Sequence, residues 1–296
     1  MSIVVVGSIN ADLTINVARH PLPGETLLGT GGRITPGGKG ANQAVAAARL
    51  GSEVFLVGAV GEDAHAKDAT NLLIDAGVDL NAVEISPKPT GLAIITVAAD
   101  GENTVMVVPG ANGDVGAGVV DKHAALVAGA DLVLLQGEIP ADGFARAVEL
   151  AKGRVVVNLA PVIDVDRNAL KRADPLIVNE HEAQLVLGKK SSPESCAKEL
   201  LREFPSVVVT LGADGALVGD STGIVRVASP FVVSVDSVGA GDAFTGALCH
   251  RLLAGDSLVE AATFAARVGA FSVTRPGAQP SYPDYSQLSP SGNGAE

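Results

Sequence analysis

Short runs of apolar residues alternate along the chain with longer Ala-rich stretches. The apolar runs are continuous, which is typical of parallel strands buried on both faces, and they predict strands at 3–6, 54–57, 132–135, 154–157, 176–178 and 207–210. The stretches between them predict helices at 41–50, 64–76, 142–151, 180–187, 193–203, 242–253 and 258–272. This alternation predicts an α/β fold with a mostly parallel central sheet. Since no long linker interrupts it, residues 1–296 are expected to form a single domain.

Two stretches, 13–34 and 91–108, break the alternation because they contain strand-like runs without a helix. The runs TINV, ETLLG, LAIITVAA and NTVMVV alternate, or nearly so, between apolar and polar residues, and Gly or Asp-Gly turns separate some of them. They predict a small β-sheet, formed by about 13–35 and 90–109, that stands off the main body. Such a sheet serves as a lid over a cleft, as a dimer contact, or as both. Residues 287–296 are expected to be a disordered tail.

The composition fits a globular protein with a large core, since hydrophobic residues make up 47% and charged residues 18% of the chain. The formal net charge of −12 disfavours nucleic acids and anionic membranes as partners. No apolar run reaches the ~18 residues of a membrane span. Cys196 and Cys249 lack the spacing of a zinc site and fit a reducing compartment. We therefore expect a cytoplasmic protein.

The segment 236–246, DSVGAGDAFTG, is the most informative motif. Backbone N–H groups of Gly239, Ala240 and Gly241, together with the start of the following helix, suit an anion such as a transferring phosphoryl group. Asp242 lies at that start and is placed to accept a proton from a substrate hydroxyl. The alternative is that Asp242 only caps the helix, which is the more common role when such a motif stands alone.

Two further segments carry polar residues next to predicted elements. In PGGKGANQAVAAARL (36–50), Lys39 and Asn42 lie at the start of a helix and offer donors to a polyol, unless the segment is only a turn and a helix start. In GSINAD (7–12), Asn10 and Asp12 follow the first strand, at the edge where open α/β sheets bind ligands. The P-loop is excluded, because Arg33 and Gly40 stand where it requires Gly and Ser or Thr.

Together these segments resemble the ribokinase family of sugar and nucleoside kinases. The resemblance covers nearly the whole chain in order, through GSINADL, PGGKGANQAVAAARLG, VGEDAHA, TGLA, PGAN, NEHEA, VVVTLGADGA, DSVGAGDAFTGAL and RPGAQPSYP. It implies a three-layer sandwich, in which helices flank the central sheet, with a β-sheet lid that often forms the dimer contact. With every segment present, the resemblance favours Asp242 as the base over the capping role.

The resemblance also implies a role for individual residues. Asp242 matches the catalytic base, and Gly239, Ala240 and Gly241 match the anion hole. The sugar site is matched by Asn10, Asp12, Gly38, Lys39, Asn42, Ala93, Glu138 and Asp242. The nucleotide and magnesium site is matched by Asn179, Glu182, Thr210, Gly212 and Gly241. The loop for a monovalent cation is matched by Asp236, Val238, Ser272, Arg275, Gly277 and Ser281, although Val238 stands where Thr is frequent.

The implied activity is ATP-dependent phosphorylation of the primary 5-hydroxyl of D-ribose, with Mg²⁺ as cofactor, K⁺ as activator and a homodimer formed through the lid. GSINAD and GAQPS favour ribose within the family. A kinase for deoxyribose, a hexose or a nucleoside is the first alternative; a nucleoside site needs a larger, usually aromatic-rich pocket, and the chain has only seven Phe and two Tyr. A non-catalytic sugar-binding regulator is the second alternative, and the presence of Asp242 and Lys39 argues against it.

Overall fold

The computed structural model describes residues 1–100 and 102–288, and its centre is a nine-stranded sheet. The strand order is β13-β12-β11-β10-β9-β8-β1-β4-β5, and all neighbours are parallel except β11–β12 and β12–β13. The strands are β1 (Ser2–Val6), β4 (Glu53–Gly61), β5 (Val83–Ser86), β8 (Leu132–Gln136), β9 (Arg154–Asn158), β10 (Leu176–Asn179), β11 (Val207–Thr210), β12 (Ala216–Asp220) and β13 (Gly223–Val227).

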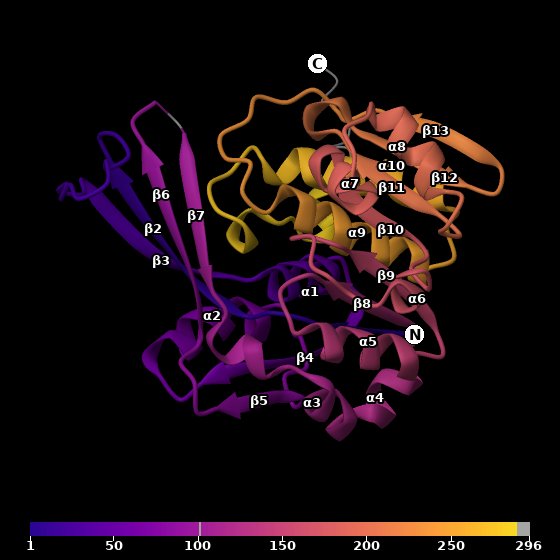
Figure 1. Cartoon of the computed structure of the whole chain (residues 1–296), viewed down its shortest axis with the longest axis horizontal. Coiled ribbons are helices and arrows are strands. Elements are labelled where there is room, and N and C mark those ends of the chain that lie inside the picture. The colour runs from indigo at the N-terminus through magenta and orange to yellow at the C-terminus, as the bar shows by residue number, and fades with distance from the viewer. Residues whose placement is uncertain (101, 289–296) are drawn as a thin grey trace, which may run out of the picture.

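Helices cover both faces of this sheet, so the predicted three-layer sandwich is confirmed (Figure 1). Ile3 and Val5 face one helical layer: α1 (Lys39–Arg49), α2 (Ala64–Asp75), α9 (Ala240–Leu253) and α10 (Leu258–Ser272). Val4 and Val6 face the other: α3 (Ala117–Lys122), α4 (Ala124–Gly129), α5 (Ala141–Leu150), α6 (Arg167–Leu170), α7 (Glu180–Leu187) and α8 (Pro193–Leu200). Alternate residues of one apolar run therefore enter opposite cores, as expected for a strand buried on both faces.

Each strand predicted from a continuous apolar run and each predicted helix is present, with ends shifted by a few residues. The pattern did not predict β5, β12, β13 or the short helices α3, α4 and α6. Most of β13 is exposed, so it carries no continuous apolar run. The short helices span four to six residues, which is too little for a helical period to show.

The second sheet is small and extends to one side of the main body (Figure 1). Its order is β3-β2-β6-β7, with β2 (Asn10–Val17), β3 (Gly31–Gly37), β6 (Gly91–Ala98) and β7 (Asn103–Val108). The central pair β2–β6 is parallel and the outer pairs are antiparallel. The strand predicted over ETLLG (25–29) is wrong: the partner of β2 is GGRITPG, and Leu28 is 91% exposed in a loop.

The C-terminal end of the described chain is a turn of 3₁₀ helix, Tyr285–Leu288. The first two residues of the predicted disordered tail, 287 and 288, belong to that turn. The rest of the predicted tail, 289–296, lies outside the described residues.

Helices α1 and α9 pack closely enough to exclude a side chain at their contact. A Cβ added at Gly246 of α9 would lie 2.6 Å from Ala46 Cβ and 2.6 Å from the carbonyl oxygen of Gln43, both in α1. The N-terminal ends of the two helices carry Lys39 and Asp242. The glycine therefore sets the distance between the helices that deliver these side chains.

Gly246→Ala is expected to lower the free energy of unfolding by about 1–3 kcal/mol, because an added methyl group forces the two backbones apart. Urea denaturation measures this change. Gly118→Ala in α3 is the matched control, since nothing lies within 4 Å of the position of its added Cβ. Equal stability of the two variants would contradict the close α1–α9 contact.

Candidate active site

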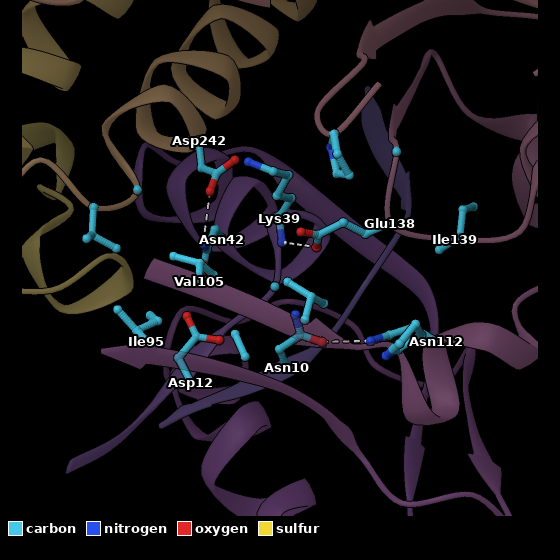
Figure 2. A pocket seen from close by; sticks show the side chains of 18 of the residues that line it. Asn10, Asp12, Lys39, Asn42, Ile95, Val105, Asn112, Glu138, Ile139 and Asp242 are labelled. Atoms are coloured by element: carbon cyan, nitrogen blue, oxygen red, sulfur yellow. Dashed lines mark hydrogen bonds between the residues drawn. The ribbon is translucent and has the colours of Figure 1, made fainter. Parts of the chain in front are cut away.

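A cavity of about 810 Å³ lies at the carboxyl ends of the central strands, beside the small sheet (Figure 2). Every residue assigned to the sugar site by the resemblance lines it: Asn10, Asp12, Gly38, Lys39, Asn42, Ala93, Glu138 and Asp242. Gly239, Val238 and Glu182 line it as well, whereas the lining does not include Ala240, Gly241, Asn179, Thr210 or Gly212. Residues from opposite ends of the sequence are thus gathered around one space.

The start of α1 is held in place by Gly38 and Glu138. Gly38 has φ 86° and approaches Asn10 so closely that a Cβ would lie 2.8 Å from the Asn10 nitrogen, so only glycine fits this turn. Glu138 Oε2 accepts hydrogen bonds from the Lys39 backbone N–H at 3.0 Å and from Ser8 Oγ at 2.5 Å. These contacts fix one carboxylate oxygen of Glu138 and orient the Lys39 side chain over the cavity.

Asn112 is a lining residue to which the sequence analysis gave no role. Its Nδ2 donates to Asn10 Oδ1 at 2.7 Å, and its Oδ1 accepts from the Ile9 N–H at 2.9 Å. The Asn112 side chain is buried, and its hydrogen bond to Asn10 orients the Asn10 amide (Figure 2). The PGAN segment (109–112) that contains it was part of the family resemblance, and that was the one available signal.

Asp242 does not cap its helix. The N-cap of α9 is Gly239, and no side chain caps it. The carboxylate is instead directed toward α1, where Oδ2 accepts from Asn42 Nδ2 at 2.9 Å and Oδ1 accepts from Gln43 Nε2 at 2.8 Å. The capping alternative is therefore wrong, and the buried carboxylate faces the cavity with both oxygens oriented by amide donors.

The charged groups of the cavity influence one another strongly. Burial raises the pKa of Asp12 to about 7, helped by the negative charges of Glu138 and Asp242. Asp12 Oδ1 is buried without a hydrogen-bond partner among the described residues. Asp242 is the main cause of a raised pKa at Lys39. Asp242 therefore helps to hold the Lys39 ammonium in its charged form. Asp12 Oδ1, by contrast, is left to accept a hydrogen bond from a ligand's hydroxyl.

The residues matched to the nucleotide site lie at the neighbouring strand ends. Asn179 and Thr210 are partners at the ends of β10 and β11, and Gly212 begins the next turn. Asn179 and Glu182 form a capping box at the start of α7, with N–H to oxygen distances of 2.8 and 2.7 Å. Burial raises the pKa of Glu182. Of the residues matched to the nucleotide and magnesium site, Glu182 lines the cavity. One carboxylate fits Mg²⁺, which keeps most of its waters and shares phosphate oxygens.

The residues matched to the cation loop form two connected turns beside Gly239. Asp236 joins the turns, because its Oδ1 accepts from the Val238 N–H at 3.0 Å and its Oδ2 from the Gly277 N–H at 2.8 Å. Ser272 and Ser281 are buried, and the Arg275 guanidinium stacks 3.9 Å from the centre of the Phe271 ring. The positively charged side chain of Arg275 is thus turned onto an aromatic ring, and of this residue only the backbone carbonyl is suited to bind a cation. Within the described residues, no group of three or more His, Cys, Asp and Glu side chains suits a metal.

Known proteins place this arrangement in a family. The family model described as pfkB family carbohydrate kinase matches residues 1–285. The chain belongs to the pfkB family of carbohydrate kinases. This pfkB-family chain is 38% identical to the ribokinase of Haemophilus influenzae over 292 residues, which cover 95% of each chain. It is 33% identical to the deoxyribokinase of Salmonella typhi over 298 residues, which cover 97% of each chain.

Solved structures agree with this assignment. Ribokinase from Thermotoga maritima matches with a TM-score of 0.89 and 31% identity, over 97% of this chain and 98% of that one. Arabidopsis thaliana ribokinase, complexed with ribose and ATP, matches with a TM-score of 0.90 and 32% identity, over 97% of both chains. The predicted resemblance to the ribokinase family is confirmed, and this pfkB-family kinase transfers phosphate to a sugar hydroxyl. In the part of the chain that the structure describes, no helix is long and apolar enough to cross a bilayer.

Asp12→Asn is expected to stabilise the unliganded protein at pH 8. The folded-state pKa of about 7 lies above the ordinary value of 3.8, so ionised Asp12 disfavours folding. This cost is absent below about pH 4 and grows as the pH rises to 7. The gain should be on the order of 2 kcal/mol at pH 8 and vanish near pH 4. Urea denaturation without sugar at several pH values measures it.

Asp68→Asn on the exposed surface of α2 is the control, and it should leave the pH dependence of stability unchanged. An Asp12→Asn variant that is less stable than the wild type at pH 8 would show that the ionised carboxylate has a stabilising partner.

Proposed function

We propose that this kinase phosphorylates the 5-hydroxyl of D-ribose with ATP, and that Asp242 is the catalytic base. The observation that carries the proposal is the position of Asp242: a buried carboxylate, oriented by two amides, that faces a cavity lined by polyol-binding groups. The ribokinase relatives, and the Arabidopsis ribokinase complexed with ribose and ATP, support the choice of substrates.

Each lining group has a part in this reaction. Asn10, Asp12 and Glu138 offer the acceptors and donors that hold the ring hydroxyls and leave the terminal hydroxyl near Asp242. Asp242 takes the proton as that oxygen attacks the terminal phosphorus of ATP, and the bond from this phosphorus to the bridging oxygen breaks, so that ADP leaves. Backbone N–H groups at Gly239, Ala240 and Gly241, at the start of α9, stabilise the charge on the transferring group, and Lys39 adds a positive charge nearby.

Mg²⁺ would be held through Glu182, with Asn179 orienting that carboxylate, and would neutralise phosphate charge. Thr210 and Gly212 would contact the nucleotide at the ends of the neighbouring strands. The lid, about 13–35 and 90–109, contributes Ala93, Ile95, Val105 and Val107 to the cavity. These apolar side chains would exclude water from the phosphate once sugar is bound.

K⁺ would be held beside the anion hole, by the oxygen atoms of the loops at Asp236, Val238, Ser272, Arg275, Gly277 and Ser281. Oxygen ligands of this type suit a hard cation. The ion would not contact substrate; it would fix the shape of the turn that leads from Asp236 to Gly239.

A homodimer through the lid is supported by Met106 and Val108 of the edge strand β7, which are 57% and 49% exposed. Sedimentation equilibrium tests the dimer.

A kinase for 2-deoxyribose is the second candidate, because a deoxyribokinase is similar over nearly the whole chain. A nucleoside substrate is less favoured, since the described residues that line the cavity include no aromatic side chain for a base to stack on. We further propose that residues 1–296 form a single kinase domain and that the protein acts in the cytoplasm.

Turnover is expected to be selective for ribose in an assay of ADP release with Mg-ATP and a panel of pentoses, hexoses and nucleosides. Asp242→Asn should lower kcat by about 10³-fold or more, because it removes the base, while ribose affinity stays within a few-fold. Asp68→Asn serves as the control. Selective turnover of another sugar would exclude ribose as the substrate. A near-normal kcat in Asp242→Asn would exclude Asp242 as the catalytic base. Ribose binding without any turnover would favour the regulator.

Replacing K⁺ by Na⁺ at constant ionic strength is expected to lower kcat several-fold with little change in the KM for ribose. The reason is that the ion shapes the anion-hole turn but does not contact the sugar. Rates measured across K⁺ concentrations test this expectation. Identical rates in K⁺, Na⁺ and a bulky organic cation would contradict the assignment of the loop.

A further inference from the structure

A network of buried amide side chains lies behind Asp242. Gln43, Gln136 and Gln279 are fully buried, and Asn158 is 8% exposed. None of the four lines the cavity. Gln136 and Asn158 are the last residues of the neighbouring strands β8 and β9, and Gln43 lies in α1. Amides so deeply buried are costly unless each has a partner, so their arrangement requires an explanation.

The first arm of the network runs from the sheet to Asp242 through Gln43. Asn158 Nδ2 donates to the carbonyl oxygen of Ile177 in β10 at 3.2 Å, which leaves Asn158 Oδ1 as an acceptor. Gln43 Nε2 donates both to that oxygen and to Asp242 Oδ1, at 2.8 Å each. A backbone carbonyl only accepts, so it fixes the orientation of Asn158, which in turn fixes that of Gln43.

Gln136 holds the other end of the same amide. Its Nε2 donates to Gln43 Oε1 at 2.7 Å. The side-chain amide of Gln43 thus has a donor on its oxygen and two acceptors at its nitrogen, and it cannot turn over without losing these bonds. These bonds present its N–H to Asp242.

The second arm reaches the other carboxylate oxygen. Gln279 Nε2 donates to Asn42 Oδ1 at 2.9 Å, and Asn42 Nδ2 donates to Asp242 Oδ2 at 2.9 Å. Both oxygens of Asp242 thus receive N–H donors, and neither meets an acceptor in these bonds. Donors on both oxygens hold the carboxylate in one rotamer.

We infer that Gln43 is a positioning residue for the phosphoryl transfer: it keeps the carboxylate of Asp242 oriented toward the hydroxyl that loses its proton. This inference rests on the proposed function, since it assigns to Gln43 an effect on the base. Gln43 does not touch the sugar, so its loss acts on kcat rather than on sugar binding.

The test compares two variants of similar size, Gln43→Met and Gln43→Glu, by kcat and KM for ribose from pH 5 to 9.5. Gln43→Met removes the N–H, and kcat is expected to fall about 10- to 100-fold with KM for ribose within threefold. Gln43→Glu places a second carboxylate against Asp242, so the two share a proton. Its acidic limb of kcat should move up by about one pH unit or more, with activity recovering at alkaline pH.

Gln184→Met is the matched control, since Gln184 donates to the carbonyl oxygen of Ser191 and has no contact with Asp242. It should change neither kcat nor the acidic limb. Thermal unfolding establishes that each variant is folded, and Gln43→Glu, which keeps the polarity of the site, supplies the test if Gln43→Met does not fold.

Asp242→Asn separates the two claims. If it is inactive while both Gln43 variants keep the wild-type kcat within twofold and the wild-type acidic limb, the role of Gln43 is overturned and the base stands. An effect of the Gln43 variants confined to stability or to KM also overturns it. If Asp242→Asn itself is active, the proposed function fails.

Discussion

The close contact between the N-terminal halves of α1 and α9 is the constraint on which the site depends. Gly246 allows the two helices to approach, and their first turns then bring Asn42 and Gln43 within hydrogen-bond distance of Asp242. The sheet below supplies the third surface, through Gln136 and Asn158 at the ends of β8 and β9. The base is thus held by two helices and a sheet at once.

Charge in the cavity is arranged around one ammonium group. Asp242, Glu138, Glu182 and Asp12 all act to raise the pKa of Lys39, with Asp242 the largest of these influences. Burial raises the pKa of Asp12 to about 7, and the negative charges of Glu138 and Asp242 add to this effect. Such a site is stabilised when a polyol donates hydroxyls to the carboxylates, because buried acceptors without donors are costly. The electrostatics therefore favour a neutral, hydroxyl-rich substrate beside an anionic phosphate.

The sequence predicted most of the architecture because strands buried on both faces, such as 132–135, are continuously apolar. It failed where burial was partial, as in β13, and where apolar residues lie in a loop, as with Leu28. The residues around the cavity could be named only through the family resemblance. The GAGD motif by itself favoured a helix cap, whereas in the structure Asp242 is hydrogen-bonded to Asn42 and Gln43 of helix α1.

The amide network could not be predicted, since its contacts join distant parts of the chain. Gln43 and Asp242 are 199 positions apart, and Gln136 is 93 positions from Gln43. A glutamine in an Ala-rich helix, or at the end of an apolar strand, is by its type an ordinary surface residue. Only the packing of α1 against the sheet shows that both are buried.

The most direct test of the account is a crystal structure of the protein with ribose and a non-hydrolysable ATP analogue. If Asp242 is the base, the 5-hydroxyl oxygen lies about 2.6–3.2 Å from a carboxylate oxygen of Asp242 and faces the terminal phosphate. Gln43 is expected to keep its hydrogen bond to the other carboxylate oxygen. A sugar whose primary hydroxyl faces away from Asp242, or an Asp242 side chain released from α1, would contradict the account.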